Sequence, residues 1–107
     1  MRVIRVGHVY RASRITGPKH NFLGMSLSDT QPSALEIVRR SINNEPPVLD
    51  EELVVRSARR GIENATIAAN AQPLYPTMIE YVESDSPDYS AYELLAAAIM
   101  NAALSDR

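Results

Sequence analysis

The side chains that could do chemistry in this sequence are few. The chain has no cysteine, and its only histidines are His8 and His20. Neither histidine has the partners at short spacing that divalent metal sites use, so the sequence predicts no metal centre. The run that contains Glu83, Asp85 and Asp88 offers the oxygen ligands that calcium prefers, but it lacks the glycine and the bidentate glutamate of an EF-hand loop. We interpret this run as an acidic, solvated loop.

Covalent and nucleotide chemistry also lack the residues they need. The serines near the acidic run have no histidine and acid that the sequence could place beside them, so nucleophilic catalysis has no support. No G-x-x-x-x-G-K-[ST] motif is present, which excludes GTP binding by a phosphate loop. The sequence therefore predicts a protein that is not an enzyme and carries no cofactor.

Basic residues gather near the N-terminus, where five of them precede the first acid, Asp29. The candidate nucleic-acid-binding residues are Arg11, Arg14, Lys19 and His20, which flank the aromatic residues Tyr10 and Phe22. Basic and aromatic side chains interleaved in this way are typical of surfaces that bind single-stranded nucleic acid. The net charge of -2 and the isoelectric point of about 5.6 count against a dedicated nucleic-acid binder. The alternative is a solvated basic face.

Three tyrosines, Tyr10, Tyr89 and Tyr92, are candidate partner-binding residues, because tyrosine is enriched at protein interfaces. Tyr10 fits a core position or a cross-strand pair equally well, and one or two of the late tyrosines are expected in the core. A second basic group comprises Arg39, Arg40, Arg56, Arg59 and Arg60. We interpret it as a solvated helix face, since Glu52 and Arg56 are four residues apart and can pair.

The length of 107 residues, with 45% hydrophobic and 22% charged residues, predicts one domain over residues 1–107. Residues 2–15 are predicted as a strand with Val3, Val6 and Val9 on its apolar side, and residues 16–21, "TGPKHN", as a turn. A second strand follows at 22–29, in which Gly24 is a candidate bulge. Residues 34–42 fit a strand and a short helix equally well.

The second half of the chain predicts helix, strand, helix. Asp50 is the expected N-cap of the first helix, whose apolar stripe consists of Val54, Ala58, Gly61, Ile62 and Ala65. Gly61 on that stripe indicates that another backbone approaches closely, and residues 70–73 end the helix. Pro76 fits the beginning of the next strand or a sheet edge. Ser90 and Glu93 form a capping-box pattern before the second helix, for which we expect Leu94 or Leu95, Ala98, Ile99 and Ala102 on the apolar side.

The motifs "VVRSARRGIENA" at 54–65, "LYP" at 74–76 and "YELLAAAIMNAAL" at 92–104 resemble those of domain IV of elongation factor G, the ribosomal translocation factor. The resemblance covers residues 7–105, with motifs only from Val54 onward. It implies an α+β fold of order β-β-β-α-β-α: a split β-α-β sandwich with a four-stranded sheet and two helices on one face. It also implies that residues 34–42 are a strand and that Gly61 lies where the first helix crosses the sheet.

The departures from that family concern its functional loops. The family's loop before the last helix carries a histidine at its tip, whereas this chain has the shorter "ESDSPDYS". The glycine-rich hairpin tip of the family corresponds only loosely to "TGPKHN". The chain is therefore not a translocase, and fold alone does not determine what it does.

Two functions are compatible with these observations. The first is a small non-enzymatic interaction module that binds a protein partner or a second copy of itself through an open sheet face or an edge strand. The second is an RNA- or ribosome-associated module that uses the basic hairpin. No run of about 18 apolar residues and no signal-peptide pattern is present, so we expect no membrane span and a cytoplasmic location.

Overall fold

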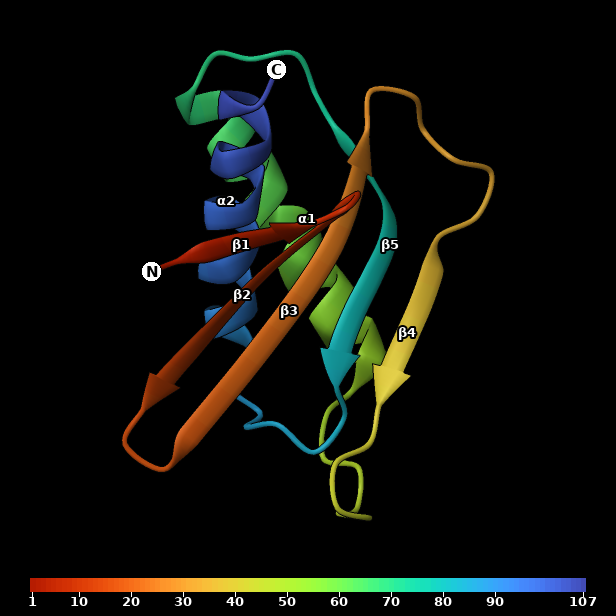
Figure 1. Cartoon of the computed structure of the whole chain (residues 1–107), viewed down its shortest axis with the longest axis vertical. Helices are drawn as coiled ribbons and strands as arrows, with labels where there is room; N and C mark the ends of the chain where they lie inside the picture. Colours follow the sequence, from red (N-terminus) through yellow and green to blue (C-terminus); the bar gives the residue numbers. More distant parts are fainter.

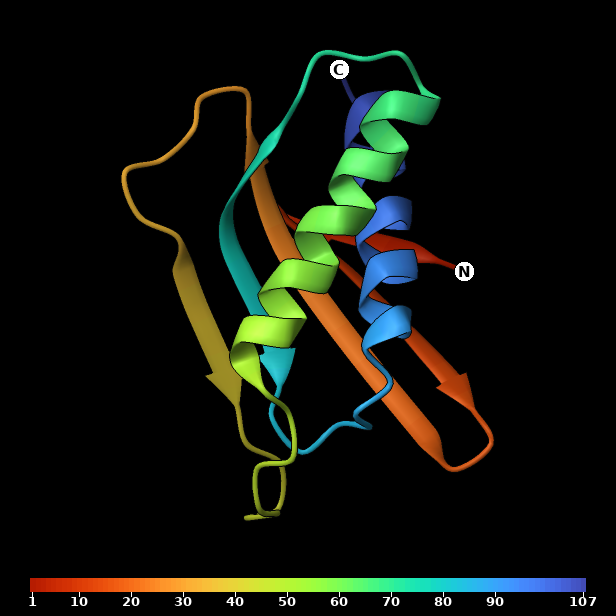
Figure 2. The same cartoon turned by 180° about the vertical axis from the view of Figure 1, so that it is seen from behind.

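A computed structural model describes all residues, 1–107, in two layers: a five-stranded sheet and a pair of helices packed on one of its faces (Figures 1 and 2). In chain order the elements are β1 (Val3–Val6), β2 (Val9–Thr16), β3 (Lys19–Ser28), β4 (Glu36–Arg40), α1 (Glu51–Ala68), β5 (Tyr75–Val82) and α2 (Tyr89–Ser105). The strands lie in the order β1-β2-β3-β5-β4. The predicted α+β class, with both helices on one face, is confirmed.

The predicted number of four strands is wrong, because residues 2–15 form two strands. Val6 pairs with Val9 across a two-residue turn whose first residue, Gly7, has a φ of +62°. Glycine adopts this left-handed conformation without steric cost, and it suits the tight turns that join antiparallel strands. The three-residue spacing of Val3, Val6 and Val9 does not fit one continuous strand, since side chains alternate with a period of two.

The ambiguous residues 34–42 contain a strand. β4 pairs with β5 in parallel, from Glu36 opposite Met78 to Arg40 opposite Val82. The resemblance implied a split β-α-β unit, in which a further strand lies between the two parallel strands. Here β4 and β5 are direct neighbours, so that expectation is wrong. In Figure 1 both strands run downward, α1 returns behind the sheet and β5 lies to the left of β4. The crossover is therefore left-handed, opposite to about 98% of such connections.

Helix α1 follows its sequence pattern closely. The carboxylate of Asp50 accepts hydrogen bonds from the backbone N–H groups of Glu52 (3.0 Å) and Leu53 (3.4 Å), so the predicted N-cap is confirmed. The five residues of the predicted apolar stripe are the buried residues of the helix. The helix ends at Ala68, and Asn70 has a φ of +48°, a left-handed conformation typical of the residue after a helix.

Helix α2 begins two residues earlier than its capping pattern predicts. Tyr89 is the first helical residue, and the hydroxyl of Ser90 donates to the Asp88 carboxylate at 2.6 Å instead of capping the helix. The predicted capping box is therefore wrong. Of the predicted apolar positions, Leu95 and Ile99 are buried, but the stripe continues through other neighbours; its members are Ala91, Tyr92, Leu95, Ala96, Ile99, Met100 and Ala103.

Gly61 marks the point where the two helices touch. A Cβ atom placed on Gly61 would lie 2.2 Å from the carbonyl oxygen of Glu93 and 2.9 Å from the Cβ of Ala96. The predicted close approach of another backbone is confirmed. The backbone belongs to α2, so the position inferred from the resemblance, a crossing of helix and sheet, is wrong.

One apolar cluster fills the space between the layers. Its largest enclosed side chains include Leu23 and Met25 of β3, Ile79 and Tyr81 of β5, and Tyr92 of α2. Pro76 lies second in β5, which is an inner strand, and so occupies the beginning of a strand as predicted. None of the helices is both long enough and apolar enough to span a membrane.

Candidate functional site

One face of the sheet has no helix above it (Figure 1). The strand registers place these residues on the uncovered face: Ile4, Val6, Val9, Arg11, Ser13, Ile15, His20, Phe22, Gly24, Ser26, Glu36, Val38, Arg40, Met78, Glu80 and Val82. A sheet face that stays solvated usually alternates polar residues outward. Here the set mixes large apolar residues with charged ones, which makes it the candidate site.

A single row of residues crosses all five strands on the uncovered face. Ile4 lies opposite Arg11, and Arg11 opposite Gly24. Gly24 lies opposite Glu80, and Glu80 opposite Val38. The centre of the row is therefore charged and both of its ends are apolar.

Glu80 is only 2% exposed although no helix covers it. The Nε of Arg11 donates to its Oε1 at 3.0 Å, and the Nε of Arg40 donates to its Oε2, with which Nη2 of Arg40 also forms an ion pair. The side chains of Arg11 and Arg40 remain 36% and 52% exposed. Long basic side chains can bury their stems and keep their charged ends in water, and here the arginines enclose the carboxylate in this way.

Gly24 gives that carboxylate its space. A Cβ atom on Gly24 would lie 2.5 Å from Oε1 of Glu80, so any other residue would displace the acid. The bulge predicted at this glycine is wrong, because the register of β3 and β5 shifts between Ser26 and Leu27 instead. Gly24 is needed for a close approach of a side chain and not for a change of register.

Large apolar side chains stand exposed on the same face. Ile4 and Val6 of β1 are 51% and 55% exposed, and Ile15 near the end of β2 is 72% exposed. Single exposed apolar residues are normal on protein surfaces. Ile4 and Val6 lie two residues apart on the same strand, at the edge of the sheet, and so extend the face to its free border.

The four residues predicted to bind nucleic acid do not form one surface. Arg11 is held by Glu80 on the uncovered face. Arg14 and Lys19 project from the other side of the hairpin, toward Asp88. The pKa of Asp88 is lowered mainly by the hydrogen bond from Ser90, with the charges of Lys19 and Arg14 adding to the effect.

His20 is paired within the chain. Its Nδ1 lies 3.0 Å from Oδ1 of Asp85, and the other oxygen of Asp85 accepts from the backbone N–H of Phe22 at 2.9 Å. The backbone N–H of Ser86 also donates to the carbonyl of His20 at 3.1 Å. The loop between β5 and α2 is thereby fastened to β3, and the interpretation of a solvated acidic loop is wrong for the buried Asp85.

The three tyrosines predicted to bind a partner make contacts within the chain. Tyr92 is fully buried, and burial raises its pKa, so its ring offers no surface to a partner. Tyr10 is also buried, and its hydroxyl donates to Asp106 at 2.8 Å. The hydroxyl of Tyr89 accepts from the backbone N–H of Asp50 at 2.9 Å.

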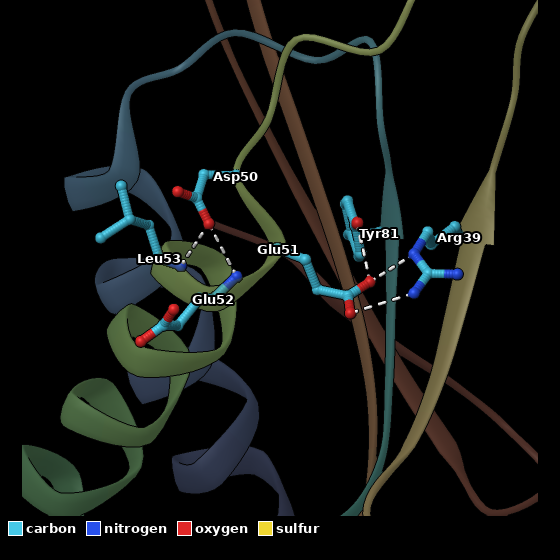
Figure 3. Close-up of polar contacts among 6 residues, drawn as sticks. All are labelled: Arg39, Asp50, Glu51, Glu52, Leu53 and Tyr81. Carbon is cyan, nitrogen blue, oxygen red and sulfur yellow. Dashed lines mark hydrogen bonds and ion pairs between the residues drawn. The ribbon is translucent and has the colours of Figure 1, made fainter.

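A second charged cluster lies on the helix side of the sheet (Figure 3). Arg39 donates to both carboxylate oxygens of Glu51, at 2.5 and 3.1 Å, and the hydroxyl of Tyr81 donates to the same carboxylate at 3.0 Å. Burial, followed by the hydrogen bond to Glu51, raises the pKa of Tyr81 to about 12. This cluster joins the first turn of α1 to strands β4 and β5.

The grooves of the surface contain no comparable cluster of charged side chains. A groove of about 290 Å³ lies between α1 and the start of β5, with Ile62, Ile67 and Leu74 in its walls. Nowhere do three or more histidine, aspartate or glutamate side chains come together as a metal site would require. On the uncovered face, by contrast, two guanidinium groups share a single carboxylate.

The sequence did not point to Glu80, and it predicted other roles for Arg40, in a solvated basic face, and for Gly24, in a bulge. The sequence does contain one signal for Glu80. It lies between Met78 and Val82 on one side of a predicted strand, and an acid on an apolar side needs a polar partner if it is buried.

A scan against protein-family models finds no match to this chain, and neither does a search of the curated proteins. The resemblance to domain IV of elongation factor G therefore stays a prediction from the motifs.

Proposed function

We propose that this chain is a non-enzymatic interaction module, and that its uncovered face binds a protein partner or a second copy of the chain. The observation that carries the proposal is the combination of Ile4, Val6 and Ile15 standing exposed on the same helix-free face of the sheet. Apolar side chains gathered on one face often mark an interaction surface. The adjoining edge strand β1 also leaves backbone groups free for pairing with a further strand.

An RNA- or ribosome-associated role is the second candidate. It is supported by the β2–β3 hairpin, which extends beyond the ends of the helices in Figures 1 and 2 and carries Arg14 and Lys19. The hairpin register weakens this candidate, because Arg11 and His20 lie on one side of the hairpin and Arg14 and Lys19 on the other. The four basic side chains therefore cannot contact one run of phosphates together.

Site-specific photocrosslinking in cells tests the proposed function. A benzophenone amino acid placed at Ile4 or Ile15 samples the uncovered face, and the same group at Glu63 or Asn101 samples the exposed sides of the two helices. We expect adducts from the two sheet positions and few from the helix positions. Adducts that are degraded by protease but not by ribonuclease identify a protein partner.

Light scattering of the purified chain separates a foreign partner from a second copy. A dimer that forms as concentration rises, and that Ile4→Lys abolishes while Glu63→Lys does not, assigns the face to self-association. Adducts that form only at the helix positions would refute the proposed function. Adducts cleaved by ribonuclease would support the second candidate.

A further inference from the structure

Glu80 is not needed to hold the layers of the fold together. Its two partners, Arg11 and Arg40, come from the same sheet, and no helix or loop joins the cluster. A buried ion pair is weak evidence for stability, because removing charges from water costs about as much as their attraction returns. The arrangement instead fixes the positions of two arginines on the uncovered face.

Both arginines keep hydrogen-bond donors for a ligand. Arg11 uses only its Nε for Glu80, which leaves both of its terminal nitrogens, and Arg40 keeps Nη1. Neither guanidinium donates to any other acceptor in the chain. Guanidinium groups held in place by a carboxylate resemble an anion-binding pair, since planar donors of this kind match a carboxylate or a phosphate.

We propose that Arg11 and Arg40 together bind the carboxylates of an extended, acidic segment of a protein partner. This inference rests on the proposed function and specifies what the uncovered face recognises. The row that contains Arg11 and Glu80 ends in the apolar residues Ile4 and Val38, one on each edge strand. An occupant with acids in the middle and apolar residues at its ends complements this row in charge and in polarity.

The dimensions of the row define the length of that segment. Five neighbouring strands place Ile4 and Val38 about 19 Å apart, at roughly 4.8 Å per strand. In an extended heptapeptide, residues 1 and 7 are about 20 Å apart, and residues 3 and 5 point to the same side between them. Arg11 lies in the row, whereas Arg40 comes from the next position on the same side of β4 and brings its guanidinium to the row by bonding Glu80. Apolar residues at 1 and 7 with glutamates at 3 and 5 would therefore meet the two ends and the two guanidinium groups.

A protein segment fits this face better than RNA does. Apart from Arg11 and Arg40, the uncovered face has no cation except His20, which is paired with Asp85. Strands of RNA are bound through several phosphates at once, and Arg14 and Lys19 lie on the other side of the hairpin. Two arginines flanked by isoleucine and valine suit a few carboxylates between apolar side chains.

Nuclear magnetic resonance of the intact ¹⁵N-labelled chain tests the inference with three probes. The first is the acetylated and amidated heptapeptide Val-Ser-Glu-Ser-Glu-Ser-Val, the second is the same peptide with glutamine in place of both glutamates, and the third is an octamer of uridylate. We expect the glutamate peptide to shift the Nε–H signals of Arg11 and Arg40 and to bind at least about fivefold more tightly than the glutamine peptide. Raising the salt concentration should weaken this binding.

Variants locate the effect. Arg11→Gln and Arg40→Gln should reduce binding of the glutamate peptide to the level of the glutamine peptide. Arg11→Lys keeps the charge but lacks the planar donor edge, and should bind at an intermediate level. The matched control is Arg56→Gln, which removes an arginine from the exposed pair with Glu52 on α1 and should leave binding unchanged.

Each other outcome overturns the inference in a distinguishable way. If both peptides bind the uncovered face equally well, the face does not recognise carboxylates, and the inference fails while the proposed function stands. Shifts confined to the helices, binding of uridylate alone, or no shift at about 1 mM of the glutamate peptide would refute the anion site. The proposed function itself fails only if the crosslinks from Ile4 and Ile15 are also absent.

Discussion

The two sides of the sheet each have one glycine that makes room and one glutamate bound by arginine, but these residues have different roles. On the helix side, Gly61 of α1 admits the backbone of α2, and Glu51 joins α1 to Arg39 of β4. On the uncovered face, Gly24 admits the carboxylate of Glu80, and no helix lies above it. The first set holds two layers together, whereas the second arranges charge at a surface.

The contrast is sharpest at two consecutive residues of β4. Arg39 and Arg40 point to opposite faces because side chains alternate along a strand. Arg39 donates to a helix residue, so its role follows from the fold. Arg40 donates to Glu80 of the adjacent strand, to which β4 is already joined by backbone hydrogen bonds. A role in binding explains Arg40 better than a role in stability, and the two faces should therefore respond differently to substitution.

The largest effect is expected at the helix contact. Gly61→Ala would place a methyl group 2.2 Å from a backbone oxygen of α2, and a backbone cannot move aside as a side chain can. We expect a loss of about 3 kcal/mol in the free energy of unfolding, even though alanine favours the helix by about 1 kcal/mol. Urea denaturation followed by circular dichroism measures the loss. Glu63→Ala on the exposed side of α1 is the control, and equal stability of both variants would contradict the close contact.

The second effect tests whether the cluster stabilises the sheet or whether Glu80 only positions Arg11 and Arg40. The double variant Arg11→Gln, Arg40→Gln leaves a buried carboxylate without a cation, and we expect it to cost about 2 kcal/mol because water can reach the site from the open side. Adding Glu80→Gln should restore most of this stability. The single variant Glu80→Met in the original background should unfold at nearly the same urea concentration as the parent.

A large loss from Glu80→Met would show that the cluster stabilises the sheet. The uncovered face would then resemble the covered one, and the contrast between them would fail. A negligible loss from the double arginine variant would mean that the carboxylate is less buried than the structure shows.

The sequence predicted well those features that depend on neighbours along the chain. The stripe of α1 and its cap at Asp50 follow from spacings of two to four residues, and they are confirmed. Glu80 lies 69 residues from Arg11 and 40 from Arg40, so only the pairing of strands brings the three together. Residues 34–42 are ambiguous for the same reason. Ile37 and its neighbours form a strand because they pair with β5, which is distant along the chain. The division of residues 2–15 depends on the left-handed φ of Gly7, a conformation that a lone glycine in a strand-like sequence does not by itself indicate.

The third effect concerns Gly24 and depends on Glu80. Gly24→Ala would place its Cβ 2.5 Å from a carboxylate oxygen, so the end of the glutamate side chain would have to shift. We expect a loss of about 1 kcal/mol and a change in the Nε–H signal of Arg11. In a Glu80→Ala background, the same substitution should be neutral or stabilise by roughly 0.5 kcal/mol, because alanine restricts the unfolded chain more than glycine does. A double-mutant cycle gives the coupling, and additive effects would show that Gly24 does not accommodate the acid.

The smallest effect is a difference in pH dependence on the covered face. The hydrogen bonds from Arg39 lower the pKa of Glu51 below its ordinary value of 4.5, and the hydroxyl of Tyr81 adds to this. A lowered pKa in the folded state means that the ionised carboxylate stabilises the fold. Its contribution is complete above the ordinary value and disappears as the pH falls through the value in the folded protein.

The stability difference between the parent and Glu51→Gln should therefore shrink as the pH is lowered from about 5 to about 3. Glu52→Gln removes an acid from the same first turn and serves as the control for the interaction with the helix dipole. Urea midpoints at several pH values give both differences. If the two variants change in parallel, the bond from Arg39 to Glu51 does not hold α1 on the sheet, and the covered face would depend on apolar packing alone.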